Sequence, residues 1–254
     1  MLRIMPFTLL MIMLISPALA EDIKLNANDR VEYHQHEQKL VAIGNAVASK
    51  GNMSIKAHKL VGFYNAKNKN KISRVEAHQN VIMSSDQIKA WGDDMIYDVK
   101  ADSAVLTGKP ARIKTPDGEI TSSGPITYWQ SKRQALAQNN VIVTDKRGNK
   151  IFSDKMTAYF IKDKVEKLVI DKVDIAGNIK IVTKDGEITA DSGTYFANNK
   201  IVKLFNNITI NQKGNILKGD VAETDLNTGI SKILSNKKGR VSGVFKETKK
   251  EKSK

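Results

Sequence analysis

The chain is built from a short motif that recurs about every thirty residues. The motif is an asparagine, an apolar residue, a variable residue and a second apolar residue, and its copies begin 29 to 38 residues apart. Five clear copies and one degenerate copy start at Asn45, Asn80, Pro110 (the degenerate copy), Asn140, Asn178 and Asn207. A unit of this size cannot bury its apolar face alone, so successive copies must stack and share one interior. The repeat therefore predicts one elongated domain.

Two further elements follow the asparagine motif. An apolar-polar-small-polar tetrapeptide begins eight to eleven residues later, at Ile55, Ile88, Ile120, Ile151, Ile188 and Leu217, with an extra copy at Leu25. Seven to nine residues further on stands a tyrosine, and this column holds all 6 tyrosines: Tyr33, Tyr64, Tyr97, Tyr128, Tyr159 and Tyr195. Apolar and polar residues alternate within the elements, as in strands with one buried face. Turn sequences such as Pro116-Asp117-Gly118 separate them, and no stretch after Ala20 keeps a helical period. The fold class is therefore all-β.

The two ends of the chain differ from the repeat region. Residues 1–20 combine one basic residue, an apolar stretch and a small-residue ending, the pattern of a signal peptide cleaved between Ala20 and Glu21. An uncleaved membrane anchor is the alternative, although an apolar stretch of about 12 residues is short for a span of roughly 20. Residues 21–245 are predicted to form the β domain, and residues 246–254 a basic, disordered tail. Cleavage places the mature protein in the periplasm.

Composition and motifs argue against an enzyme. The chain has no cysteine, which excludes disulfides, thiolate metal sites and thiol catalysis. His34 and His36 would share one face of a strand, but no third metal ligand accompanies them. No nucleophile elbow, Walker sequence or dinucleotide fingerprint is present. The net charge of +14 favours an anionic partner, and export argues for a lipid, polysaccharide or membrane surface rather than a nucleic acid. We expect neither catalysis, nor a metal, nor a cofactor.

Three segments resemble the LptA/OstA-like lipopolysaccharide-transport family. They are residues 23–28, the Gly-Lys-Pro-Ala segment 108–113 followed by Tyr128, and residues 214–220 continuing to Val241. The resemblance implies an open antiparallel β-jellyroll, V-shaped in section, whose apolar groove holds the acyl chains of lipid A. It also implies end-to-end joining through terminal strands and a bridge between an inner-membrane-anchored component and an outer-membrane component. The chain is longer than a typical member, so one subunit is expected either to span more distance or to oligomerise less.

Inward-facing residues are the predicted lipid-contact residues. The resemblance assigns Ile23, Leu25, Ile113, Tyr128 and Leu217. Alternation within the repeat adds Ala46, Ala48, Ile55, Val81, Met83, Ile88, Ile120, Val141, Val143, Ile151, Ile179, Ile181, Ile188, Ile208 and Ile210. The same residues would fill the closed core of a ligand-free β-solenoid, so lipid contact and plain packing both stay open. A membrane-anchored relative that retains residues 1–20 is the third hypothesis.

Two local features carry their own predictions. A tyrosine ring is apolar along its body and polar at its tip, so the tyrosine column suits the wet edge of a groove. Pro110 has no amide hydrogen to donate to a ladder, so the degenerate copy predicts an edge or a kink there.

Overall fold

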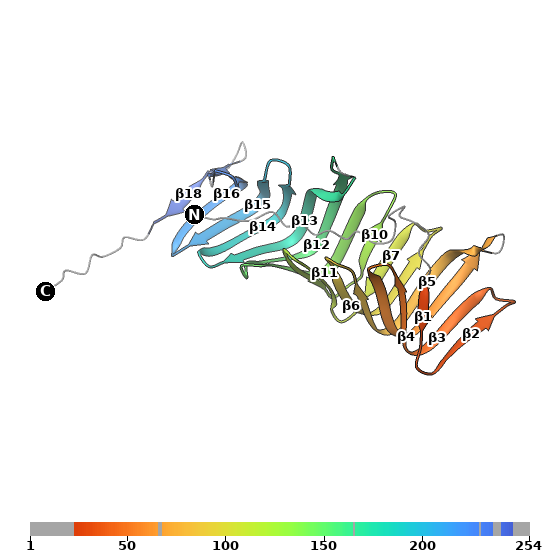
Figure 1. Ribbon diagram of the computed structural model, residues 1–254. Helices are drawn as coiled ribbons and strands as arrows, with labels where there is room; N and C mark the ends of the chain where they lie inside the picture. The colour runs from red at the N-terminus through yellow and green to blue at the C-terminus, as the bar shows by residue number, and fades with distance from the viewer. Residues whose placement is uncertain (1–22, 66–67, 165, 229, 236–239, 246–254) are drawn as a thin grey trace.

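The computed structural model describes residues 23–65, 68–164, 166–228, 230–235 and 240–245. These residues form an elongated stack of antiparallel strands, with the first strands at one end and the last at the other (Figure 1). The predicted all-β fold is confirmed. None of the described segments is a helix that could span a membrane. The predicted signal peptide, residues 1–20, and tail, residues 246–254, lie outside the described residues.

The described residues contain 18 strands, all linked in one sheet. Their bounds are β1 Lys24–Asn26, β2 Arg30–His34, β3 Lys39–Lys50, β4 Met53–Asn65, β5 Asn68–Ser84, β6 Lys89–Asp98, β7 Ser103–Thr107, β8 Ala111–Thr115, β9 Gly118–Ser122, β10 Ile126–Trp129, β11 Gln134–Asp145, β12 Lys150–Lys162, β13 Leu168–Thr183, β14 Gly186–Phe196, β15 Ile201–Gln212, β16 Asn215–Asp225, β17 Ser231–Leu234 and β18 Ser242–Val244.

Long strands change direction at a pair of residues with left-handed backbone. The pairs are Gly44-Asn45, Gln79-Asn80, Asn139-Asn140, Gly177-Asn178 and Asn206-Asn207, with φ between 45° and 87°. The register with the next strand is interrupted at every pair. Such bulges bend a strand and increase its twist. The asparagine that opens each clear copy of the motif therefore lies inside a strand, at its bend.

Asparagine is suited to this position for two reasons. It enters the left-handed region more readily than most residues that carry a Cβ atom. Its side chain also ties the bend to the preceding strand, because Asn178 Nδ2 donates to Asp154 Oδ2 at 2.8 Å and Asn207 Nδ2 donates to Asp191 Oδ2 at 2.7 Å. Asp154 and Asp191 close the apolar-polar-small-polar element. Two motifs of the repeat thus meet at the bend.

The bends divide the strands into two facing walls. Wall A comprises the strand halves that lead from the bends to the connections at 51–52, 85–88, 116–117, 146–149, 184–185 and 213–214. Wall B comprises the halves that lead to the connections at 35–38, 99–102, 130–133 and 197–200. Buried residues of both walls form one apolar cluster, as Ala137 and Val143 show on either side of the bend in β11.

The side opposite the bends, here called the open side, has no backbone ladder across it. Every strand pairing among the described residues runs along a wall, and none joins the free edge of wall A to that of wall B. The walls are therefore linked covalently at the bends and touch elsewhere through side chains.

The degenerate third copy replaces the bend with a break. β7 ends at Thr107 and β8 begins at Ala111, and β6 pairs with both. β9 and β10 are separated by residues 123–125, and β11 pairs with both. Pro110, which follows a cis peptide bond, lies in the first gap. The predicted kink at Pro110 is thus confirmed as an interruption of the strand.

A charged cluster on the outer surface of wall B surrounds His78. The ring nitrogen Nδ1 lies 2.8 Å from Asp94 Oδ1, and Nε2 lies 3.1 Å from Glu76 Oε2. The partner of His78 on β4 is Lys59. Partial burial disfavours the charged ring, but the hydrogen bonds to Asp94 and Glu76 outweigh it and raise the pKa of His78.

Replacing Gly177 with alanine should loosen a bend. A Cβ atom there would lie 2.3 Å from Asp154 Oδ2, at a φ of +77°, so Asp154 must rotate and release Asn178. We expect Gly177→Ala to lower the free energy of unfolding by about 2–3 kcal/mol, of which ~1 kcal/mol is the strain of left-handed alanine. Gly148→Ala is the matched control, because its φ is +83° and nothing lies within 4 Å of the added atom. Equal losses for the two variants in urea unfolding would contradict this account.

The His78 cluster should make stability depend on pH. Because the folded-state pKa is raised, protonated His78 stabilises the fold fully below its unfolded pKa of about 6.5, and this contribution is lost as pH rises through the folded pKa. His78→Gln should therefore destabilise the protein more at about pH 5.5 than at about pH 8.5 in urea unfolding. His58→Gln, at an exposed position, serves as the control. A His78→Gln penalty that does not change with pH would refute the assignment.

Candidate functional site

An apolar interior between the two walls is the candidate site. The buried apolar cluster runs from Ala42 near the N-terminal end to Ala222 near the C-terminal end and receives side chains from successive strands. The polar groups buried with it are side-chain hydroxyls. The buried polar residues among those described are Thr115, Ser122, Ser153, Thr157 and Thr224. Such a surface attracts hydrocarbon and offers no charge to a polar ligand.

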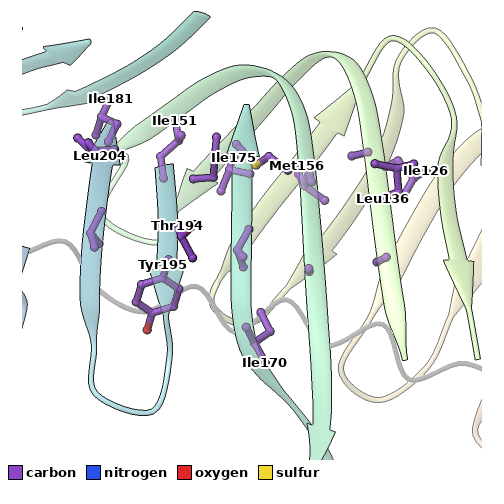
Figure 2. A pocket seen from close by; sticks show the side chains of 17 residues that line it. Ile126, Leu136, Ile151, Met156, Ile170, Ile175, Ile181, Thr194, Tyr195 and Leu204 are labelled. Atoms are coloured by element: carbon purple, nitrogen blue, oxygen red, sulfur yellow. The ribbon is translucent and has the colours of Figure 1, made fainter. Parts of the chain in front are cut away.

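A cavity opens within this interior at the level of β9 to β15. Figure 2 shows its lining side chains converging from both walls. The lining consists of Ile120, Ile126, Ala135, Leu136, Ala137, Val143, Ile151, Met156, Ala158, Ile170, Val173, Ile175, Ile181, Thr194, Tyr195, Val202 and Leu204.

The cavity is narrow in this conformation. The volume of the cavity is about 80 Å³. The empty space in and around it, including the part open to solvent, is about 900 Å³. An engineered apolar cavity that admits benzene is larger, at about 150 Å³. A long hydrocarbon chain therefore requires the walls to move apart, and the absence of a ladder across the open side among the described residues permits that movement.

A second, more polar crevice lies on the open side. Its lining comes from the wall A connections, through Gln87, Ile88, Thr115, Pro116 and Asp117, and from the start of β13 in wall B, through Lys167, Leu168 and Val169. Its volume is about 260 Å³. The free edges of the two walls thus approach each other here and leave room between them.

The tyrosine column lies in wall B at the ends of its strands. Five of the six tyrosines are the last residue but one of their strand. Tyr128 and Tyr195 are 4% and 7% exposed, Tyr97 is half-buried, and Tyr33, at the N-terminal end, is 57% exposed. The column therefore borders the open side, which is the place expected for a groove edge.

Tyr159 departs from the column. A register irregularity between Tyr159 and Phe160 puts Phe160 inside, at 5% exposure, where it meets Tyr128 edge-on with ring centroids 6.2 Å apart. The Tyr159 ring instead lies under Lys172, whose Nζ is 4.4 Å from the ring centroid. One repeat thus exchanges a tyrosine for a phenylalanine at the interior.

Tyr195 carries the unusual polar group of the cavity lining. Its hydroxyl is buried and has no hydrogen-bond partner, and burial raises the pKa of Tyr195 to about 12. The other hydroxyl of the lining is satisfied, because Thr194 Oγ1 donates to Asp174 Oδ1 at 2.9 Å. Burial also raises the pKa of Tyr97 and that of Tyr128.

Most of the sequence-predicted contact residues belong to wall A. Tyr128 lies in wall B, Ile88 in a connection of wall A, and Ile23 ahead of β1. Thirteen of them are buried: Ala46, Val81, Met83, Ile88, Ile113, Ile120, Tyr128, Val141, Val143, Ile179, Ile181, Ile188 and Ile208. Leu25, Ala48, Ile55, Ile151 and Ile210 pack against the buried cluster while partly exposed, and Leu217 is half-buried. Ile23 is 52% exposed and lies outside the packed interior, because it precedes the paired residues of β1. Whether any of these residues contacts lipid stays a prediction.

Wall B is the part of the site that the sequence analysis missed. Only Ile120, Val143, Ile151 and Ile181 of the cavity lining were predicted. The missed residues include Met156, Ile175 and Leu204, which alternate with outward residues as the wall A residues do. The available signal was the alternation of apolar and polar residues in segments that precede the asparagine motifs, such as Ile201–Leu204.

The histidine pair does not form the geometry expected for it. His34 ends β2, whereas His36 lies in the following turn, so the two do not share a strand face. His34 Nε2 lies 2.8 Å from Glu32 Oε2. The described residues contain no group of three potential metal ligands.

Comparison with known proteins identifies a family and solved structures with a similar chain. A family model described as "LptA/(LptD N-terminal domain) LPS transport protein" matches the chain twice, over residues 26–131 and 119–230. The crystal structure of LptH, described as the LptA homologous periplasmic component of the conserved lipopolysaccharide transport device from Pseudomonas aeruginosa, is 12% identical over 89% of this chain and 96% of that one. Its TM-score is 0.22. No curated protein matches the sequence.

Tyr195 should ionise only at strongly alkaline pH. Because its folded-state pKa is raised to about 12, the stability contributed by the neutral phenol is complete below the unfolded pKa of about 10 and is lost as pH rises toward the folded value. Absorbance titration of the phenolate should show a component near pH 12 that Tyr195→Phe removes and Tyr159→Phe retains. Persistence of that component in Tyr195→Phe would contradict the assignment.

Proposed function

Because the chain belongs to the LptA/(LptD N-terminal domain) family of LPS transport proteins, we propose that its two walls enclose the acyl chains of lipopolysaccharide. The sugars and phosphates of lipid A remain on the open side, in water. The observation that carries this proposal is the apolar interior, which continues from repeat to repeat between Ala42 and Ala222. No covalent step is needed, since the task is to keep hydrocarbon out of water during transit.

The energetics suit a carrier. Each methylene group removed from water contributes about 0.8 kcal/mol, so several acyl chains provide a large driving force. Moving the walls apart exposes apolar surface, but the entering chains cover it again. The walls exchange one set of apolar contacts for another, and the net cost of opening is small while lipid is present.

The ends of the stack are proposed to form the bridge. β2 pairs with β3 alone, and β17 and β18 pair with β16 alone, among the described residues. Apolar side chains are exposed beside these edges, with Val31 at 51%, Leu234 at 52% and Phe245 at 71%. A free strand edge can add a strand from another chain. We infer contacts here with further copies of the chain and with the inner-membrane-anchored and outer-membrane components of the export bridge.

The compartment follows from the same proposal. A carrier between two membranes works in the periplasm, and residues 1–20 have the pattern of a signal peptide cleaved between Ala20 and Glu21. N-terminal sequencing of the mature protein distinguishes a start at Glu21 from a retained membrane anchor.

A ligand-free scaffold is the second candidate. The observation that favours it is the small volume of the closed cavity, about 80 Å³. The two candidates differ in what happens when lipid is offered, because a scaffold has no reason to separate its walls.

Adjacent substitutions on opposite faces of β13 test the proposal. Ile181 is 3% exposed and lines the cavity, whereas Lys180 faces outward and pairs with Glu187 at 2.8 Å. We expect Ile181→Asp to abolish the binding of lipopolysaccharide in equilibrium dialysis, because it places a charge among the acyl chains, and Lys180→Asp to keep binding within about twofold. Similar affinities for the two variants would mean that lipid does not enter between the walls.

A buried aspartate also weakens the fold, so a second measurement uses positions that tolerate change. Ile151 lines the cavity and the next residue, Phe152, faces outward, and both are half-buried. A photo-crosslinking benzophenone side chain should capture lipopolysaccharide at position 151 and not at position 152. Capture at neither position, with both variants folded, would support the scaffold.

A further inference from the structure

We propose that the hydroxyl of Tyr195 hydrogen-bonds an oxygen atom on the acyl part of the bound lipid, near the point where the chain joins its headgroup. This inference rests on the proposed function and adds a requirement to it. The site would then select acyl chains that carry an ester, amide or hydroxyl oxygen close to the head, and would not treat all hydrocarbon alike.

The unpaired hydroxyl is the first observation. Tyr195 is 7% exposed, so more than nine-tenths of it is buried, and its Oη finds no donor or acceptor in the protein. A buried polar group without a partner loses its hydrogen bonds to water and gains none in return. Other lining groups do not supply the bond, because Thr194 is engaged with Asp174 and the remaining lining side chains are apolar.

The position of the hydroxyl is the second observation. Tyr195 is the last residue but one of β14 and precedes the connection at 197–200. Its ring is flanked by its strand partners Val173 and Val202. Figure 2 shows the hydroxyl directed along the strands toward that connection, away from the centre of the cavity. A lipid whose chains lie in the interior and whose head lies on the open side would bring its first oxygen atoms to this level.

Phenylalanine in the same column shows that the interior does not need a hydroxyl for packing. In the preceding repeat the buried position is held by Phe160, at 5% exposure. The hydroxyl at Tyr195 is therefore an addition to an aromatic contact that works without it. Desolvation keeps the phenol neutral, and a neutral phenol can donate to a carbonyl or hydroxyl oxygen.

The experiment compares two probes on three proteins. Wild type, Tyr195→Phe and Tyr159→Phe are titrated with lipopolysaccharide and, separately, with diphenylhexatriene, a fluorescent hydrocarbon that has no oxygen. We expect Tyr195→Phe to bind lipopolysaccharide about tenfold more weakly, the loss of one hydrogen bond in a dry site, and to bind diphenylhexatriene with unchanged affinity. Tyr159→Phe, whose ring lies on the outer face under Lys172, should match wild type with both probes.

The melting temperature without ligand is a second readout. Removing an unsatisfied hydroxyl should leave it equal to that of wild type or raise it. Unchanged affinity of Tyr195→Phe for lipopolysaccharide would overturn the inference, and so would an equal loss for both probes, which would show that the residue only packs. Both results leave the proposed function standing. Failure of wild type to bind lipopolysaccharide at all would instead remove the proposed function and the inference with it.

Discussion

Paired left-handed residues in the middle of a strand are the constraint on which this architecture depends. Most residues avoid that conformation, and here it recurs at the same place in long strands from β3 to β15. Alignment of the bends from strand to strand makes all of them fold in one direction. Because the long strands that carry these pairs are turned over at corresponding places, two walls form and face each other. Asparagine–aspartate hydrogen bonds join two of the bends to the preceding strand, from Asn178 to Asp154 and from Asn207 to Asp191.

Once the walls face each other, the same apolar side chains form the core and line the cavity between the walls. Hydrogen bonds run without interruption along each wall, and among the described residues none crosses the open side. A force that pulls the two ends of the stack apart is therefore resisted by the hydrogen bonds between strands. A force that separates the two walls at the open side is resisted by apolar contacts alone. The body is stiff in one direction and compliant in the other. A carrier that must release its cargo needs contacts of the second kind, since they have no fixed geometry to be rebuilt.

Much of the fold was predictable from the sequence, because the repeat places recognisable residues at fixed positions within the alternating pattern of apolar and polar residues. The all-β class, the turns and most of wall A followed from motifs that carry an asparagine or a small residue at a fixed place. Wall B has the same alternation, as in Ala135 and Ala137. Its marker residue, the tyrosine, stands at the strand ends and is out of phase at Tyr159, so it sets the phase less reliably than the asparagine motif does in wall A. The bend itself was hidden because an asparagine before an apolar pair looks like the start of a strand.

Other features were beyond sequence reasoning for physical reasons. Phe160 takes the interior position expected for Tyr159 because the strand register is irregular between them. Aligning the repeats by sequence does not reveal a shift of one residue. The same holds for His36, which leaves the strand for a turn. The width of the cavity depends on how two distant halves of each strand pack, and no local pattern encodes that distance.

The third repeat has a consequence for the whole body. Strands β7 to β10 are short, and irregular segments at 108–110 and 123–125 replace the bends that join the walls elsewhere. The two family matches overlap at residues 119–131, which include β9 and β10. The family model thus matches the chain once on each side of a region where the bends are missing. At this level irregular backbone takes the place of the paired left-handed residues, so the corner between the walls is set there by a break in each strand and not by a bulge.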